Sequence, residues 1–293
     1  MIRDGIDPRL TLGAVHLTVA DLERCIAFYT GRLGFRLRRR EPDVAHLSAG
    51  EEDLLVLWRV PGASRVRGTT GLYHFAILVP SRAELGGVVG HLLATRTPLS
   101  GASDHAVSEA IYLSDPEGNG IEVYRDRPRS EWPLDGSGVR MISDPLDLED
   151  LLAERMPGAP PWSRLPAGTR IGHVHLQVAD LEIADRFYVG ALGFERTMRL
   201  ASALFVAAGG YHHHIGLNTW GGGGAPPPPP GSAGLRAFVL ELPDPAARER
   251  VVARARAASV PVTQGEKGVV LEDPFANRIV LASSAGGTPP ADG

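Results

Sequence analysis

Residues 13–35 read GAVHLTVADLERCIAFYTGRLGF, and residues 172–194 read GHVHLQVADLEIADRFYVGALGF. The two stretches lie 159 positions apart (172 minus 13) and are identical at 15 of 23 positions, which chance does not produce. The chain of 293 residues therefore contains an internal repeat. A repeat of this length indicates a duplicated structural unit, and this decides the fold before any other feature is considered.

Two further pairs of segments follow the first pair in the same order. The segment GLYHFAILVP, which starts at Gly71, matches GLRAFVLELP from Gly234. Later in each half, LSDPEGNGIEVY from Leu113 matches LEDPFANRIVLA from Leu271. Each half of the chain is therefore built from two parts.

Each part begins with an alternating apolar pattern, which predicts a half-buried strand, and continues with apolar residues at helical spacing. In the first part, these are Val15, Leu17 and Val19 for the strand, then Leu22, Ile26, Tyr29 and Leu33 for the helix. Asp21, Ser81 and Asp180 stand where helices are expected to start and predict N-caps. Short strand-like runs separated by turn residues follow each helix.

The chain is thus expected to be α+β, with four βαβββ modules. We number them module 1 to module 4 and place them near 10–60, 70–127, 170–220 and 234–282.

The covalent halves suggest an N-terminal domain at 10–127 and a C-terminal domain at 170–282. Between them lies a connector at 128–169, for which one short helix is expected after Pro145. The run GGGGAPPPPPGSAG at 221–234 has low complexity and predicts a mobile surface loop.

Composition excludes several classes of protein. The 30 basic and 34 acidic residues give a net charge of −4 without a basic block, so no nucleic-acid partner is expected. Cys25 is the only cysteine, which excludes a disulfide framework and any Cys-based zinc or iron–sulfur site. The N-terminus MIRDGIDPRL lacks the apolar core of a signal peptide, and no apolar run approaches the ~18 residues of a membrane span. We expect a cytoplasmic protein without a membrane partner.

The modules differ from one another at positions where one of them carries a histidine or a glutamate. Three residues occur once each where the repeat-equivalent position is apolar: His173 against Ala14, His74 against Ala237, and Glu122 against Val280.

Strand periodicity predicts the direction of these three side chains. Val174 and Leu176 share the face that packs on the helix, so His173 projects from the other face, and the same argument applies to His74 and Glu122. Two imidazoles and a carboxylate with open coordination positions are typical of non-haem Fe(II) oxygenases, and the same set accepts Mn(II) or Zn(II). The alternative interpretation is two structural histidines and a solvated glutamate.

The four modules together resemble the vicinal oxygen chelate superfamily, which includes glyoxalase I, bleomycin-resistance proteins and extradiol ring-cleaving dioxygenases. The resemblance rests on HVHLQVADLE, on FYVGALGF, on the histidine of the second such strand and on DPEGNGIE. The segments YLSDPEGNGIEVYRD and YHHHIGLNTW are most similar to the catechol 2,3-dioxygenase branch. The implied fold has paired modules that form two glyoxalase/dioxygenase-like barrels.

By this resemblance the metal ligands are His74, Glu122 and His173, and His214 is an optional fourth ligand, since glyoxalase I uses four. The implied metal is Fe(II), with Mn(II) or another divalent ion as the alternative. The usual two-domain dioxygenases keep all ligands in one covalent half, whereas this chain divides them between its halves. We therefore expect modules 2 and 3 to share one metal cavity and modules 1 and 4 to form a metal-free barrel.

The resemblance also implies roles for residues around the metal. His213 would act as the acid–base group, and Tyr112 would hydrogen-bond the substrate hydroxyl. His105, on the strand before Tyr112, is the third candidate catalytic residue. The alternatives are an exposed histidine-rich turn for His213, a packed aromatic side chain for Tyr112 and a surface histidine for His105. His175 and its repeat equivalent His16 are expected to be structural.

The expected activity is Fe(II)-dependent extradiol cleavage of catechol or a related diphenol. The expected partners are thus a small aromatic diol and O2, and the sequence leaves the oligomeric state open, a homo-oligomer included. A glyoxalase-type metal-dependent lyase or isomerase and a bleomycin-resistance-like binding protein are the alternatives within the same superfamily.

Overall fold

The computed structural model of the protein describes residues 5–135, 138–154, 161–265 and 268–283. Module 1 consists of β1 (Thr11–Val19), α1 (Leu22–Gly31), β2 (Arg36–Arg40), β3 (Val44–Ser48) and β4 (Asp53–Arg59). Module 2 consists of β5 (Gly71–Leu78), α2 (Arg82–Ala94), β6 (Gly101–Asp104), β7 (Ser108–Ser114) and β8 (Gly120–Asp126). The connector contains η1 (Arg129–Glu131), β9 (Leu134–Asp135), β10 (Gly138–Val139) and α3 (Leu148–Ala153).

Module 3 consists of β11 (Arg170–Gln177), α4 (Leu181–Asp185), the π-helical turn η2 (Arg186–Ala191), β12 (Glu195–Arg199), β13 (Ala203–Ala207) and β14 (Ile215–Asn218). Module 4 consists of β15 (Gly234–Leu242), α5 (Pro245–Ala257), β16 (Val262–Gly265), β17 (Gly268–Glu272) and β18 (Arg278–Ser283). Each module runs strand, helix and three strands, which confirms the α+β class and the four βαβββ modules.

Helix starts follow the predicted caps. The side chains of Asp21, Ser81 and Asp180 accept hydrogen bonds from backbone N–H groups in the first turn of α1, α2 and α4. Each cap satisfies a donor that the helix itself leaves unpaired. None of the helices in the described ranges is long and apolar enough to cross a membrane.

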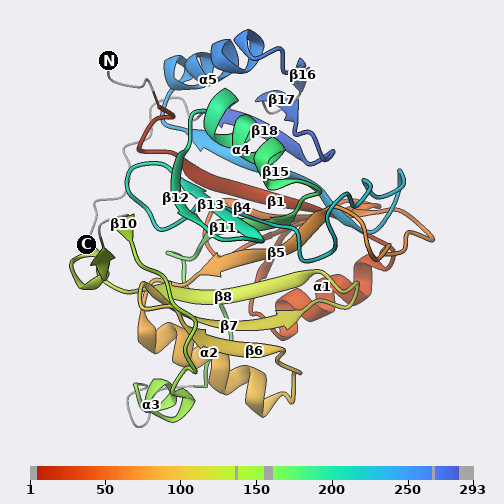
Figure 1. The fold of residues 1–293 in the computed structure, drawn as a ribbon. Coiled ribbons are helices and arrows are strands. Elements are labelled where there is room, and N and C mark those ends of the chain that lie inside the picture. Colours follow the sequence, from red (N-terminus) through yellow and green to blue (C-terminus); the bar gives the residue numbers. More distant parts are fainter. Residues whose placement is uncertain (1–4, 136–137, 155–160, 266–267, 284–293) are drawn as a thin grey trace.

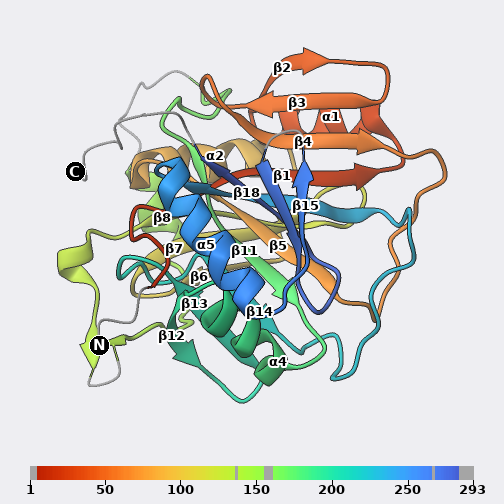
Figure 2. The same cartoon turned by 90° about the horizontal axis from the view of Figure 1, so that it is seen from above.

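The modules combine across the covalent halves into two eight-stranded sheets. The sheet that we call the 2–3 sheet has the order β12-β13-β14-β11-β5-β8-β7-β6 and unites modules 3 and 2. The 1–4 sheet has the order β16-β17-β18-β15-β1-β4-β3-β2 and unites modules 4 and 1. Figure 1 shows α2 below strands β6 to β8, and Figure 2 shows strands β1 to β4 side by side. The structure therefore has the exchanged pairing that the division of the ligands predicts.

The two sheets share one apolar core. Val15 and Leu17 of β1 and Val174 and Leu176 of β11 are fully buried and belong to the same cluster of apolar side chains. Because side chains alternate along a strand, this packing directs His173 to the opposite face of the 2–3 sheet.

A tyrosine and an aspartate from the repeated motifs join the two modules of each covalent half. The Tyr29 hydroxyl donates to Asp115 at 2.8 Å, and the equivalent Tyr188 hydroxyl donates to Asp273 at 2.8 Å. Burial raises the pKa of Asp115, although hydrogen bonds from Asn119 and Tyr29 act in the opposite direction. The FY and DP motifs of the sequence therefore meet in space as buried hydrogen bonds.

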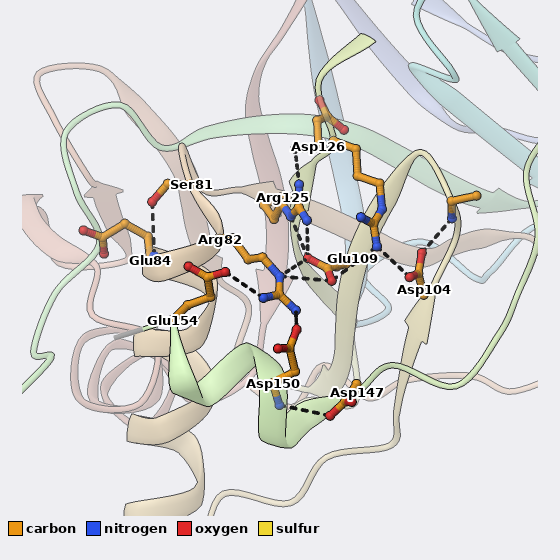
Figure 3. A network of polar contacts seen from close by, with 12 residues as sticks. Ser81, Arg82, Glu84, Asp104, Glu109, Arg125, Asp126, Asp147, Asp150 and Glu154 are labelled. Atoms are coloured by element: carbon orange, nitrogen blue, oxygen red, sulfur yellow. Dashed lines mark hydrogen bonds and ion pairs between the residues drawn. The ribbon is translucent and has the colours of Figure 1, made fainter. Parts of the chain in front are cut away.

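The connector is fastened to module 2 by an ion-pair network around Glu109, a buried residue of β7. Glu109 accepts hydrogen bonds from three arginines, namely Arg82 at 2.9 Å, Arg125 at 2.6 Å and Arg127 at 3.4 Å. Arg82 also donates to Asp150 of α3 at 2.7 Å and to Glu154 at 2.9 Å (Figure 3). Arg82 thus joins α2 to α3, and its ion pair with Glu109 attaches both helices to the 2–3 sheet.

Substitution of Glu109 by glutamine is expected to lower the free energy of unfolding by about 3 kcal/mol, because it leaves the buried guanidinium of Arg125 without its counter-charge, whereas Arg82 and Arg127 keep other carboxylate partners. Urea denaturation measures the loss. Glu154→Gln is the matched control: this carboxylate pairs with the same Arg82 but has a side chain that is 45% exposed, so its loss should cost less than about 1 kcal/mol. Equal losses in the two variants would contradict a central role for Glu109.

Candidate metal centre and its cavity

The central strands of the 2–3 sheet bring the three candidate ligands together. β11 runs antiparallel to β5, with His173 opposite Ala76 and His175 opposite His74. β8 runs parallel to β5 on its other side, with Glu122 beside Ala76. His74, Glu122 and His173 therefore project from three neighbouring strands on the same face of the sheet, as strand alternation predicts.

The donor atoms of these three residues converge. Nε2 of His74 lies 3.0 Å and Nε2 of His173 lies 3.1 Å from the same oxygen, Oε2 of Glu122. All three ligand atoms lie within 4.8 Å of one another, and all three residues are buried. Since metal–imidazole bonds are ~2.1 Å long, one ion could contact all three side chains.

The hydrogen bonding of the group fits a metal site. Nε2 of His74 is buried but makes no well-oriented hydrogen bond, although Glu122 is close. A buried nitrogen without a partner costs free energy, and a bound cation would satisfy its lone pair. The residues present therefore suit a divalent ion that takes imidazole and carboxylate ligands.

The ionisation of the group favours metal binding as well. Burial by itself raises the pKa of Glu122, but His173, through its charge and its hydrogen bond, and the charge of the nearby His74 outweigh burial and hold this pKa well below its usual range. Burial lowers the pKa of His173. An ionised carboxylate and neutral imidazoles are the forms that coordinate a divalent ion.

A cavity of about 820 Å³ opens beside the three residues. Its polar lining includes His74, His105, Tyr112, Glu122, His175 and His213. Its apolar lining includes Met198, Leu200, Phe205 and Trp220, and the connector contributes Met141, Ile142 and Ser143. Modules 2 and 3 and the connector thus build one site.

Tyr112 and His105 form a hydrogen-bonded pair on the cavity wall. The carbonyl oxygen of Ile142 accepts from Nδ1 of His105 at 2.7 Å, so Nδ1 carries the proton of the neutral ring. Nε2 of His105 must then accept, and the Tyr112 hydroxyl donates to it at 2.7 Å. Burial, reinforced by the charge of Glu122, raises the pKa of Tyr112 and keeps its hydroxyl protonated.

His213 and His214 lie in different surroundings. His213 lines the cavity, and the centre of its ring lies 4.1 Å from that of His173. Burial lowers the pKa of His213 well below its usual value. Nδ1 of His214 instead accepts the backbone N–H of Ala208 at 3.1 Å, and its ring packs on Tyr211. Contrary to the expectation of a fourth ligand, the structure places His214 outside the ligand group, because its lone pair is used by the backbone.

His175 belongs to the cavity, although the sequence suggested a purely structural role. The centre of its ring lies 5.0 Å from that of His74, and its Nε2 is buried without a hydrogen-bond partner. The ring fills the space that Gly216 leaves open, since a Cβ on Gly216 would lie 2.8 Å from Cγ of His175. The available signal was the position of His175 two residues after His173, on the same face of the strand.

Comparison with known proteins agrees with this architecture. The model of the Glyoxalase/Bleomycin resistance protein/Dioxygenase superfamily matches residues 11–123 and 170–281. The catechol-2,3-dioxygenase of Bacillus subtilis (strain 168) is 43% identical over 275 residues, which cover 92% of this chain and 95% of that protein.

Solved structures share the fold at low sequence identity. A Bacillus subtilis structure matches with a TM-score of 0.63 and 15% identity, covering 94% of this chain and 86% of that one. Glyoxalase I from Zea mays matches with a TM-score of 0.57 and 17% identity, covering 94% of this chain and 92% of that one. From the family match and the four-module fold together, we conclude that the chain belongs to the glyoxalase/bleomycin resistance protein/dioxygenase superfamily.

Proposed function

We propose that the protein is a non-haem Fe(II)-dependent extradiol dioxygenase that opens the ring of catechol or a related diphenol with O2. The observation that carries this proposal is the convergence of His74, Glu122 and His173 beside a cavity that also holds His213 and Tyr112. Membership of the superfamily and 43% identity to a catechol-2,3-dioxygenase support the reaction class.

His74, Glu122 and His173 would hold the metal. Fe(II) at this site would supply Lewis-acid and redox chemistry, and Mn(II) is the alternative ion for the same donor set. The burial of all three side chains lowers the local dielectric constant and strengthens the attraction between Glu122 and a cation.

Two side chains of the cavity would handle the substrate hydroxyls. A neutral His213 can accept a proton from a diphenol hydroxyl and return it later in the reaction. The Tyr112 hydroxyl donates a hydrogen bond to His105. The lone pairs of the Tyr112 oxygen can therefore accept a hydrogen bond from the substrate. His105 therefore orients Tyr112, and Ile142 of the connector orients His105.

The number of converging donors favours a dioxygenase over a glyoxalase-type lyase or isomerase. Three side chains converge here because His214 is turned toward Tyr211, whereas the resemblance to glyoxalase I implied a fourth ligand. The lyase is the second candidate, since the fold alone supports both chemistries. A resistance-type binding protein would require no metal.

Substitution of His173 by alanine is expected to remove iron binding and oxygen consumption together, because one of two imidazole ligands is lost. Wild-type protein loaded anaerobically with Fe(II) should consume O2 with catechol, and His173→Ala should retain no iron and consume no O2. Iron content after desalting and an oxygen electrode provide the two measurements.

The matched control is His16→Ala, a histidine on β1 of the 1–4 sheet, which should retain both properties. Equal activity of His173→Ala and the wild type would show that the site is elsewhere. Turnover of methylglyoxal with a thiol by the Ni(II)- or Zn(II)-loaded protein, without O2 uptake in the iron-loaded form, would favour the lyase.

The cavity favours a substrate larger than catechol itself. Its volume of about 820 Å³ lies in the range that accommodates drug-sized ligands. Met198, Leu200 and Phe205 line it with apolar surface. A diphenol that carries an apolar ring substituent would bury that substituent against these residues.

The value of kcat/KM is therefore expected to rise along the series catechol, 4-methylcatechol, 4-ethylcatechol and 4-propylcatechol. Burial of each methylene is worth ~0.8 kcal/mol, which corresponds to about a fourfold increase per step. Leu200→Ser should flatten this dependence. Leu93→Ser, with almost the same exposure (48% against 49%) but outside the cavity, should not. If kcat/KM of the wild type stayed constant or fell along this series, the preference for a larger substrate would be contradicted and catechol itself would be the substrate.

A further inference from the structure

A chain of hydrogen bonds runs from the cavity wall to the end of β8. Nδ1 of His213 lies 2.8 Å from Nδ1 of His212. Nε2 of His212 lies 2.9 Å from Oδ1 of Asp126, the last residue of β8. The same strand carries Glu122, so β8 supplies both a candidate metal ligand and the far end of this chain.

The chemistry of Asp126 determines the donors and acceptors along the chain. An ionised carboxylate only accepts hydrogen bonds, so Nε2 of His212 donates to it. A neutral His212 then carries a lone pair at Nδ1, which accepts the proton on Nδ1 of His213. His213 is left with its lone pair at Nε2, and this is the form that a proton acceptor for a substrate hydroxyl requires.

Asp126 and His212 are both held in place by neighbouring side chains. The Tyr211 hydroxyl donates to Oδ2 of Asp126 at 2.9 Å and lies 2.7 Å from the Tyr124 hydroxyl. The buried ring of His212 packs against Trp132, with ring centres 5.3 Å apart. This chain of hydrogen bonds therefore orients the ring of His213 through fixed contacts.

We propose that Asp126, acting through His212, is a positioning residue that fixes His213 as the Nδ1–H tautomer and presents its Nε2 lone pair to the cavity. The inference rests on the acid–base role proposed above for His213. Asp126 and His212 lie behind His213 rather than on the cavity wall, so their influence on a substrate passes through that ring.

Nitrogen-15 NMR of the histidine rings in the metal-free protein tests the tautomers directly, because long-range correlation spectra distinguish protonated from unprotonated ring nitrogens. The wild type should show His213 protonated at Nδ1 and His212 protonated at Nε2. Asp126→Ala removes the acceptor and should convert His213 to the Nε2–H form or to a mixture. Asp185→Ala removes a carboxylate of similar exposure (19% against 20%) that pairs with Arg196, and it should leave the spectra unchanged.

Two substitutions of His212 separate positioning from packing. His212→Gln retains an amide that can donate to Asp126 and accept from His213, so the His213 tautomer should persist. His212→Leu fills the space without hydrogen bonds, so the tautomer should be lost. In the iron-loaded protein, Asp126→Ala should lower kcat about 100-fold, with KM and bound iron little changed.

Protonation of His213 at Nε2 in the wild type, as would occur if His212 carried both protons, would overturn the proposal. An unchanged His213 tautomer in both Asp126→Ala and His212→Leu would overturn it as well. The expected wild-type tautomers without O2 uptake on any diphenol would instead contradict the proposed function and leave the positioning role intact.

Discussion

The antiparallel pairing of β11 with β5 is the constraint on which the candidate site depends. It places His173 opposite Ala76 of β5, and Glu122 of β8 lies beside Ala76 on the other side of β5. Because side chains alternate along a strand, a slip of one residue in β11 would turn His173 into the apolar core and expose Val174 to the cavity. Both changes cost free energy, so the burial of apolar residues protects the register that the polar site needs.

The duplication shows that this fold can carry a group of candidate metal ligands but also forms without one. β1 and β15 pair antiparallel in the 1–4 sheet as β11 and β5 do in the 2–3 sheet. The 1–4 sheet presents Ala14, Ala237 and Val280 at the positions equivalent to the three ligands. It contributes to the shared apolar core instead, so one sheet supports the other, and the candidate metal group belongs to the 2–3 sheet.

The connector is part of the site as well as a link between the halves. The carbonyl of Ile142 holds the ring of His105, which in turn accepts a hydrogen bond from the Tyr112 hydroxyl, so a backbone carbonyl sets the orientation of a hydroxyl in the cavity. The ion pairs of Arg82 fasten the connector helix α3 to module 2. Rigid support of this kind keeps side chains of a cavity in one geometry.

The sequence by itself determined the four modules, the faces of their strands and the three residues that occur once among repeat-equivalent positions. The strand faces follow from the local periodicity of apolar residues, and the three residues follow from comparing the repeats with one another. Both can be read from a single sequence. The candidate ligand set His74, Glu122 and His173 was therefore visible before the fold was known, and the division of these residues between the halves already favoured the exchanged pairing.

Only the tertiary structure decided which side chains meet. The turning away of His214 and the contact between Asp126 and His212 join segments that the sequence shows apart or in ambiguous orientation. Strand alternation gives no direction to the run at 212–214, because it lies outside regular strands. Hydrogen bonds to a loop depend on which backbone and side-chain partners the packed sheets bring within reach, and local sequence does not specify those partners.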